Sequence, residues 1–272
     1  MLSCRYTPAA PLSAFVNCLW YWEGTPQPHT KEKLLPNGEA AIIFNLRDQP
    51  IRIYDPQDLS KYESYGHAVL SGVRADCFVI DTDQQERVVG IQFRPGGAFP
   101  FFRMPAWEVE GNSVDLEDLW PGRAREIREQ LLAARSVELM FTSLERRLLQ
   151  QLVRPLELHP AVAYAIGEFQ GLSHNGRIGA VTDRIGLSSR RFIELFRRQV
   201  GLTPKVFCRV RRFQRVLQSV HGAKHLDWAD VALECGYYDQ AHFIHDFQSF
   251  SGLTPSSYIA AATPHLNHVP LS

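Results

Sequence analysis

Apolar residues change their spacing once along the chain, from the alternation of strands to the period of helices. Residues 1–108 contain short runs rich in Val, Ile and aromatic residues, separated by turns such as Pro36-Asn37-Gly38. Runs of this kind predict strands. The predicted strands are Phe15–Trp22, Glu39–Leu46, Ile51–Tyr54, Ala68–Ser71, Cys77–Asp81 and Val88–Phe93. Short strands without long helices between them predict an antiparallel barrel or sandwich.

From Leu116 onward, the apolar residues recur every three to four positions, which is typical of amphipathic helices. The pattern predicts helices at Arg123–Ala134 and Val137–Val153, after a short helix at Ala98–Met104. The two longer helices either form a dimer interface or pack back on their own domain. Further helices are predicted at Ala161–Phe169, Ile178–Ile185, Lys205–Val220, Trp228–Cys235 and Asp239–Phe250, with a loop at Gly171–Gly176.

One more amphipathic helix lies within Ser188–Pro204, and its pattern occurs twice. Its apolar stripe is formed by Phe192, Leu195, Phe196 and Val200, and its other face carries Arg190, Arg191, Glu194, Arg197 and Arg198. In Asp239–Pro255, Phe243 and Phe247 take the places of Phe192 and Phe196, and Gly-Leu-Thr-Pro ends both segments. A repeat at a fixed offset indicates one supersecondary unit used twice.

Each copy follows a shorter helix and a turn that contains glycine, which is the arrangement of a helix-turn-helix. The second helix of such a unit enters the DNA major groove, where base edges can be read. The intervening helix Lys205–Val220 spans about 24 Å at ~1.5 Å per residue. It can therefore place two recognition helices in successive major grooves, about 34 Å apart.

The charge distribution supports an anionic partner for this half. Lys and Arg equal Asp and Glu over the whole chain, 29 to 29. Within residues 177–215, however, 11 basic residues face only 2 acidic ones, a net charge of +9. A concentrated basic block is the electrostatic signature of a protein that binds the phosphate backbone.

Candidate chemistry elsewhere is sparse. Five scattered cysteines (Cys4, Cys18, Cys77, Cys208, Cys235) have no metal-ligand spacing, and His29 and His67 are too far apart in sequence for a local ligand cluster. We therefore expect no metal, cofactor or catalytic residue. The chain has no apolar run long enough for a membrane span and no signal-peptide pattern, so we expect a cytoplasmic protein. Arg94 is either a salt-bridge residue or an anion ligand, and Trp20, Trp22, Phe44 and Phe93 form either core or an apolar pocket.

A set of residues in the last third follows a recognisable order: Ala232, Cys235-Gly236-Tyr237, Asp239-Gln240, His242-Phe243, Phe247, Phe250, Gly252-Leu253-Thr254-Pro255 and Tyr258. Ile185-Gly186-Leu187-Ser188 and Phe192 to Pro204 repeat it in the first unit. On these residues, 159–258 resemble the DNA-binding domain of the AraC/XylS family of bacterial transcription regulators. Residues 1–158 resemble the β-rich sensor half of one branch of that family, through Leu35-Pro36-Asn37-Gly38, Phe93-Arg94-Pro95-Gly96-Gly97 and Leu116-Glu117-Asp118-Leu119-Trp120.

We therefore predict a multidomain α+β protein. Its N-terminal part is a β-barrel or sandwich with flanking helices, and its C-terminal part is all-α, with two helix-turn-helix units joined by a linker helix. The expected domains are a β-rich regulatory domain at 1–154, a DNA-binding domain at 155–262 and a tail at 263–272.

The resemblance implies base contacts from the exposed face of each recognition helix. The candidates are Arg190, Arg191, Ile193 and Glu194 in the first helix, and Gln240, Ala241, His242 and His245 in the second. Arg pairs with guanine, Gln with adenine and Glu with cytosine, while Ile offers an apolar contact to thymine. Candidates for phosphate contacts are Arg197, Arg198, Lys205 and Arg209. The resemblance implies Arg or Lys around the positions of His245 and Gln248. The second helix instead has Asp246 and only neutral or titratable side chains there, so we expect weaker phosphate contacts from this helix.

The leading hypothesis is a sequence-specific, DNA-binding transcription regulator without catalytic activity. Double-stranded DNA is its expected partner, and the resemblance adds RNA polymerase, a small-molecule effector and a second copy of the chain as further candidates. The effector site is not assigned to residues. An alternative is a regulator fused to an enzymatic half that accepts alkyl groups on a cysteine, which requires an activated thiolate near cations.

Overall fold

Two antiparallel sheets make up the N-terminal part of the computed structural model, which describes residues 2–24, 29–171, 178–222, 226–261, 263 and 265–271. Among these residues, the larger sheet has the order β1 (Leu2–Tyr6), β2 (Val16–Glu23), β9 (Arg87–Phe93), β4 (Ala41–Asn45), β7 (Ala68–Ser71) and β10 (Ser113–Asp115). The smaller sheet has the order β11 (His268–Leu271), β3 (Lys31–Leu34), β8 (Phe78–Asp81), β5 (Ile51–Tyr54) and β6 (Tyr62–Tyr65). The prediction of a β-rich N-terminal domain is confirmed.

The core of this domain comes from the strands that the alternation predicted. β2, β4, β5, β7, β8 and β9 lie at the predicted positions, and Phe44 and Phe93 are fully buried in the core. Gly90 of β9 pairs with Trp20 of β2, and a Cβ at Gly90 would lie 2.3 Å from the indole ring. A glycine is therefore required for the indole to cross β9.

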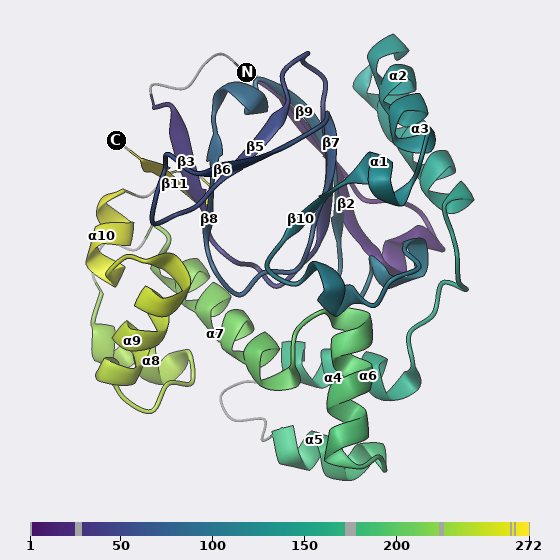
Figure 1. Cartoon of the computed structure of the whole chain (residues 1–272). Coiled ribbons are helices and arrows are strands. Elements are labelled where there is room, and N and C mark those ends of the chain that lie inside the picture. Colours follow the sequence, from purple (N-terminus) through teal and green to yellow (C-terminus); the bar gives the residue numbers. More distant parts are fainter. Residues whose placement is uncertain are drawn as a thin grey trace.

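Helices α1 (Leu116–Leu119), α2 (Arg123–Ala133) and α3 (Val137–Gln150) flank the sandwich (Figure 1). The short helix predicted at Ala98–Met104 is a single 3₁₀ turn, η3 (Phe99–Phe101). The buried face of α3 is formed by Met140, Phe141, Leu144 and Leu148. This face packs on its own domain, which was one of the two alternatives; the other was a dimer interface.

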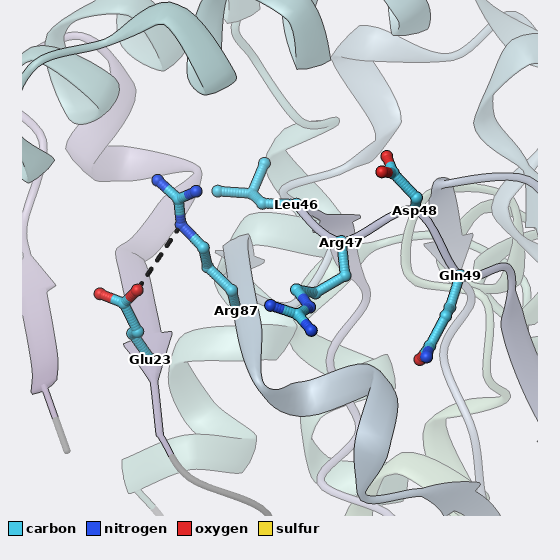
Figure 2. Close-up of a pocket in the computed structure, with 6 residues that line it drawn as sticks. All are labelled: Glu23, Leu46, Arg47, Asp48, Gln49 and Arg87. Atoms are coloured by element: carbon cyan, nitrogen blue, oxygen red, sulfur yellow. Dashed lines mark ion pairs between the residues drawn. The ribbon is translucent and has the colours of Figure 1, made fainter.

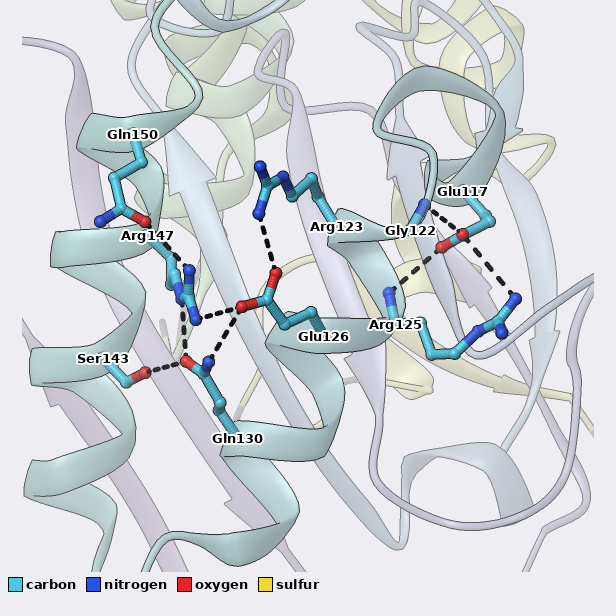
Figure 3. A network of polar contacts seen from close by, with 9 residues as sticks. All are labelled: Glu117, Gly122, Arg123, Arg125, Glu126, Gln130, Ser143, Arg147 and Gln150. Carbon is cyan, nitrogen blue, oxygen red and sulfur yellow. Dashed lines mark hydrogen bonds and ion pairs between the residues drawn. The ribbon is translucent and has the colours of Figure 1, made fainter.

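A polar network fixes α2 against α3 (Figure 3). Glu126 of α2 forms ion pairs with Arg123 and with Arg147 of α3, the latter at 2.5 Å. Gln130 accepts hydrogen bonds from Arg147 and from Ser143. Because Arg147 bonds two side chains of α2, the relative positions of the two helices are set by polar contacts as well as by the buried face.

The C-terminal helices lie below the sandwich in Figure 1, except α10, which lies at its left side. They are α4 (Pro160–Gly171), α5 (Ile178–Ile185), α6 (Ser189–Val200), α7 (Pro204–Val220), α8 (Trp228–Glu234), α9 (Gln240–Ser251) and α10 (Pro255–Ala260). The predicted helices of this half are all present, and α10 was not predicted. The loop predicted at Gly171–Gly176 starts at the last residue of α4 and otherwise lies outside the described residues.

The predicted tail is the main difference from the sequence analysis. His268–Leu271 do not trail from the C-terminal helices but form strand β11, which pairs antiparallel with β3. Val269 is buried there, and His268 bonds the buried carboxylate of Glu32. The free edge of β3 accounts for this placement, since its N–H and C=O groups gain partners. The chain therefore returns to its N-terminal sheet after the last helix.

Linker helix α7 also contacts the N-terminal domain. The Gln214 side chain donates hydrogen bonds to the carbonyl oxygen of Pro36 and to Asn267. A Cβ at Gly38 would lie 3.3 Å from Val210. The Pro36-Asn37-Gly38 turn is thus a surface on which α7 packs.

Candidate nucleic-acid interface

The first candidate recognition helix, α6, has one buried and one exposed face. The Ser188 hydroxyl caps its start by accepting a hydrogen bond from the N–H of Arg191, and Gly201 ends it with a φ of 99°. Phe192, Leu195, Phe196 and Val200 are buried, as the apolar stripe predicted. All four candidates for base contacts on this helix are exposed: Arg190, Arg191, Ile193 and Glu194. Arg191 and Glu194 form an ion pair of 3.1 Å with each other.

The second candidate recognition helix, α9, has the same construction. The Asp239 carboxylate caps it by accepting a 2.7 Å hydrogen bond from the N–H of His242. Phe243, Phe247 and Phe250 are buried. The base-contact candidates on this helix are again all exposed: Gln240, Ala241, His242 and His245. The ring of Tyr237 packs edge-on against His242, with centroids 5.2 Å apart, which orients that imidazole.

The four candidates for phosphate contacts are divided into two pairs. Arg198 and Lys205 are exposed. Arg197 instead forms a 3.2 Å ion pair with Glu110 of the N-terminal domain, and Arg209 forms a 2.6 Å ion pair with Asp246 of α9. Among the described residues, Arg198 and Lys205 therefore have no carboxylate partner in this conformation, whereas Arg197 and Arg209 do.

Sequence reasoning missed Trp107 and Glu110, which follow strand β9 in an irregular segment around η4 (Ala106–Val109). The guanidinium of Arg197 lies 5.9 Å from the centroid of the Trp107 ring. No local pattern marks either residue, because their role depends on a helix more than eighty positions away in the chain.

A second cluster that was missed surrounds Glu32 of β3. Its carboxylate oxygens lie 2.7 Å from Nε2 of His29 and 2.8 Å from Nδ1 of His268. Burial alone raises the pKa of this carboxyl, but hydrogen bonds from His268, His29 and Gln85 and the charge of His268 outweigh it and lower the pKa to about 2. Within the described part of the chain, no group of three or more His, Cys, Asp or Glu side chains is arranged to hold a metal ion.

An open hollow of about 480 Å³ lies on the N-terminal domain (Figure 2). Its lining residues are Glu23, Leu46, Arg47, Asp48, Gln49 and Arg87. Arg87 faces Glu23 across 3.9 Å, while Arg47 pairs with Glu86 just outside it. The mixed charges suit a small polar molecule better than an apolar one. None of the four aromatic residues considered for an apolar pocket lines this hollow.

Four of the five thiols lack the activation that a nucleophilic cysteine requires. Burial raises the pKa of Cys18, Cys77 and Cys235 above its usual value, and raises that of Cys208 to about 11. A reactive cysteine needs a lowered pKa. These four residues therefore offer no support for an alkyl-accepting enzyme.

Arg94 donates a hydrogen bond to the carbonyl oxygen of Ser13, so its side chain stabilises a turn rather than an ion pair.

None of the described helices has the length and apolarity that a membrane span needs.

Comparison with protein families matches residues 4–115 to a domain of unknown function (DUF6597) and residues 181–261 to a helix-turn-helix domain. The second range contains α6 and α9, so both candidate recognition helices lie inside it. No curated protein sequence matches the chain.

Among solved structures, the chain resembles ToxT from Vibrio cholerae. An apo variant of ToxT has 10% sequence identity and a TM-score of 0.47, over 90% of this chain and 98% of that chain. A second crystal form has 9% identity and a TM-score of 0.47, over 89% and 96%. Wild-type ToxT with a bound unsaturated fatty acid has 10% identity and a TM-score of 0.44, over 91% and 95%.

Proposed function

Because its C-terminal part is a helix-turn-helix domain of the AraC type, we propose that this protein is a transcription regulator that reads DNA sequence with helices α6 and α9. The observation that carries the proposal is the pair of capped helices whose candidate base contacts are all exposed while their apolar stripes are buried. The exposed face of such a helix can enter a major groove while its apolar stripe stays packed in the domain.

The exposed side chains suggest a division of roles. On α6, Arg190 and Arg191 are suited to guanine, Glu194 to cytosine and Ile193 to a thymine methyl group. On α9, Gln240 is suited to adenine, Ala241 to a methyl group, and His242 and His245 to hydrogen bonds with base edges. Arg198 and Lys205 then contact phosphate, which fixes the register of the protein on the duplex.

The N-terminal domain is proposed to regulate this DNA binding. The proposed division keeps 1–154 as the regulatory domain and 155–262 as the DNA-binding domain, with β11 tying the end of the chain to the regulatory sheet. A small polar effector in the hollow near Arg47 and Arg87 would act on the sheet that includes β2 and β9. A second copy of the chain and RNA polymerase are the other proposed partners.

Selection of bound DNA from a random pool tests the proposal. The full chain is expected to enrich one motif with two half-sites. Arg190→Ala and Gln240→Ala are each expected to relax one position, in the first and second half-site respectively, at a cost of about 1–3 kcal/mol. Matched controls are Arg135→Ala and Gln218→Ala, which remove the same side chains from exposed positions outside the recognition helices.

The controls should select the same motif as the unaltered protein. The proposal fails if the full chain enriches no motif. The assignment of faces fails if Arg190→Ala and Gln240→Ala select the same motif as their controls.

A further inference from the structure

We propose that Glu110 of the N-terminal domain withholds Arg197 of α6 from the DNA backbone, so that the regulatory domain sets the affinity of the first recognition helix through one ion pair. The inference rests on the proposed function and adds its regulation. It concerns the junction at which α6 ends against the segment around η4.

Arg197 belongs to the face of α6 that is proposed to meet DNA. Residues three, four and seven positions apart lie on one face of a helix. Arg190, Glu194 and Arg197 are spaced in this way, and the first two are exposed. The same face thus begins with exposed side chains, of which Glu194 pairs with Arg191 of the same helix. It ends at Arg197, which pairs with Glu110 of the N-terminal domain.

The contact itself is specific but weak enough to open. Nη2 of Arg197 donates to Oε2 of Glu110 at 3.2 Å, and its guanidinium lies near the Trp107 ring. The two side chains remain 41% and 32% exposed, and pairs exposed to this degree contribute little to stability. Nε of Arg197 is buried without a hydrogen-bond partner in the described part of the chain. A buried donor without a partner disfavours this position of the guanidinium, and Nε can gain a partner only when the side chain moves.

The junction around the ion pair is close but incompletely packed. A Cβ at Gly201 would lie 3.3 Å from Val73 and 3.4 Å from the carbonyl oxygen of Ala106. Beside it, an apolar hollow of about 30 Å³ separates Val200 of α6 from residues of the N-terminal domain such as Val109. A small shift of η4 relative to α6 therefore has room to occur.

The position of Glu110 depends on the larger sheet. The N–H of Gly111 donates to the carbonyl oxygen of Val73, two residues after the end of β7, and the Arg74 side chain donates to the carbonyl oxygen of Gly111. Val109 is buried in the core. A change in the β7–β10 edge of the sheet would consequently move Glu110 and release Arg197.

A double-mutant cycle on the selected DNA tests the inference. Glu110→Gln keeps the shape of the side chain and removes its charge, so we expect binding about threefold to tenfold tighter. The slope of log K against log[salt], measured between about 50 and 200 mM, should steepen by about 0.9, the value for one added phosphate contact. In the Arg197→Ala background, the same Glu110→Gln change should alter neither affinity nor slope.

Glu108→Gln is the control, because it removes an equal charge from an exposed position in the same segment. A gain from Glu110→Gln that persists without Arg197, or that Glu108→Gln reproduces, overturns the inference in favour of general repulsion. No gain at all from Glu110→Gln also overturns it. If Arg197→Ala does not fold, Arg197→Gln takes its place in the cycle. Failure of every protein, including the unaltered one, to prefer the selected DNA instead overturns the proposed function.

Discussion

Asp246 shows how a residue on a recognition helix can have a structural role. From sequence, it was expected to weaken phosphate contacts, as an acidic residue on a helix proposed to bind DNA. In the structure it is only 3% exposed, and both of its carboxylate oxygens accept hydrogen bonds from Arg209 of α7. Arg209, expected to contact phosphate, is therefore the partner that makes burial of Asp246 possible. The pair thus links α7 to α9, and Asp246 contributes to the packing of these two helices.

The contribution of a single residue to stability can be tested at Glu32, whose buried carboxylate bonds His29 and His268. Its folded pKa of about 2 lies below the ordinary 4.5, so the carboxylate stabilises the fold above about pH 4.5 and loses this contribution as the pH falls towards 2. Glu32→Gln should therefore lower the free energy of unfolding at about pH 6 by about 2–3 kcal/mol, and by much less near pH 2. Denaturant unfolding over this pH range measures the difference.

Glu108→Gln serves as the control, because Glu108 is exposed. It should change stability by less than about 0.5 kcal/mol throughout. A Glu32→Gln deficit that stays constant as the pH falls would show that lost packing, rather than the charge, accounts for it.

Among the elements, β3 and β11 explain why the alternation of apolar residues found only part of the sandwich. Lys31–Leu34 has two charged residues, Glu32 and Lys33, at positions that the structure buries. Lys33 is buried because its ammonium donates to the carbonyl oxygen of Ser251, at the end of α9. β11 contains Pro270, which the sequence rules accept only at an edge of a sheet. Both strands thus depend on partners that lie more than two hundred residues away.

Strand β11 can be tested by ending the chain at Ala261. The truncation removes buried Val269, the His268–Glu32 contact and the hydrogen bond from Gln214 to Asn267. We expect the free energy of unfolding to fall by about 2–4 kcal/mol. Hydrogen exchange should quicken at the backbone amides of β3 that bond β11. His268→Ala in the full chain is the comparison, and it should cost less than the truncation. Unchanged exchange in β3 would contradict the pairing.

For the whole molecule, sequence predicted the two helix-turn-helix units because each is a local pattern that occurs twice. It did not predict how those units sit on the sandwich. This arrangement depends on contacts between individual residue pairs, such as Gln214 with Pro36 and Arg197 with Glu110. They occur once and follow no period, so only the folded chain brings them together. The proposed regulation depends on one of these contacts, between Arg197 and Glu110, and no pattern in the sequence predicts it.

The two recognition helices differ in charge, and this difference can be tested across the molecule. Helix α9 carries no Lys or Arg, and its Gln248 takes the place that Arg197 has in α6, five residues after the matched phenylalanine. Gln248 is exposed, whereas the side chain of Arg197 is paired with Glu110. Gln248→Arg should therefore tighten binding to the selected DNA and steepen the salt slope by about 0.9. Gln218→Arg, which adds the same charge at an exposed position of α7, should change the slope by clearly less. Equal slopes for the two variants would mean that α9 does not face the phosphate backbone and that its proposed reading face is misplaced.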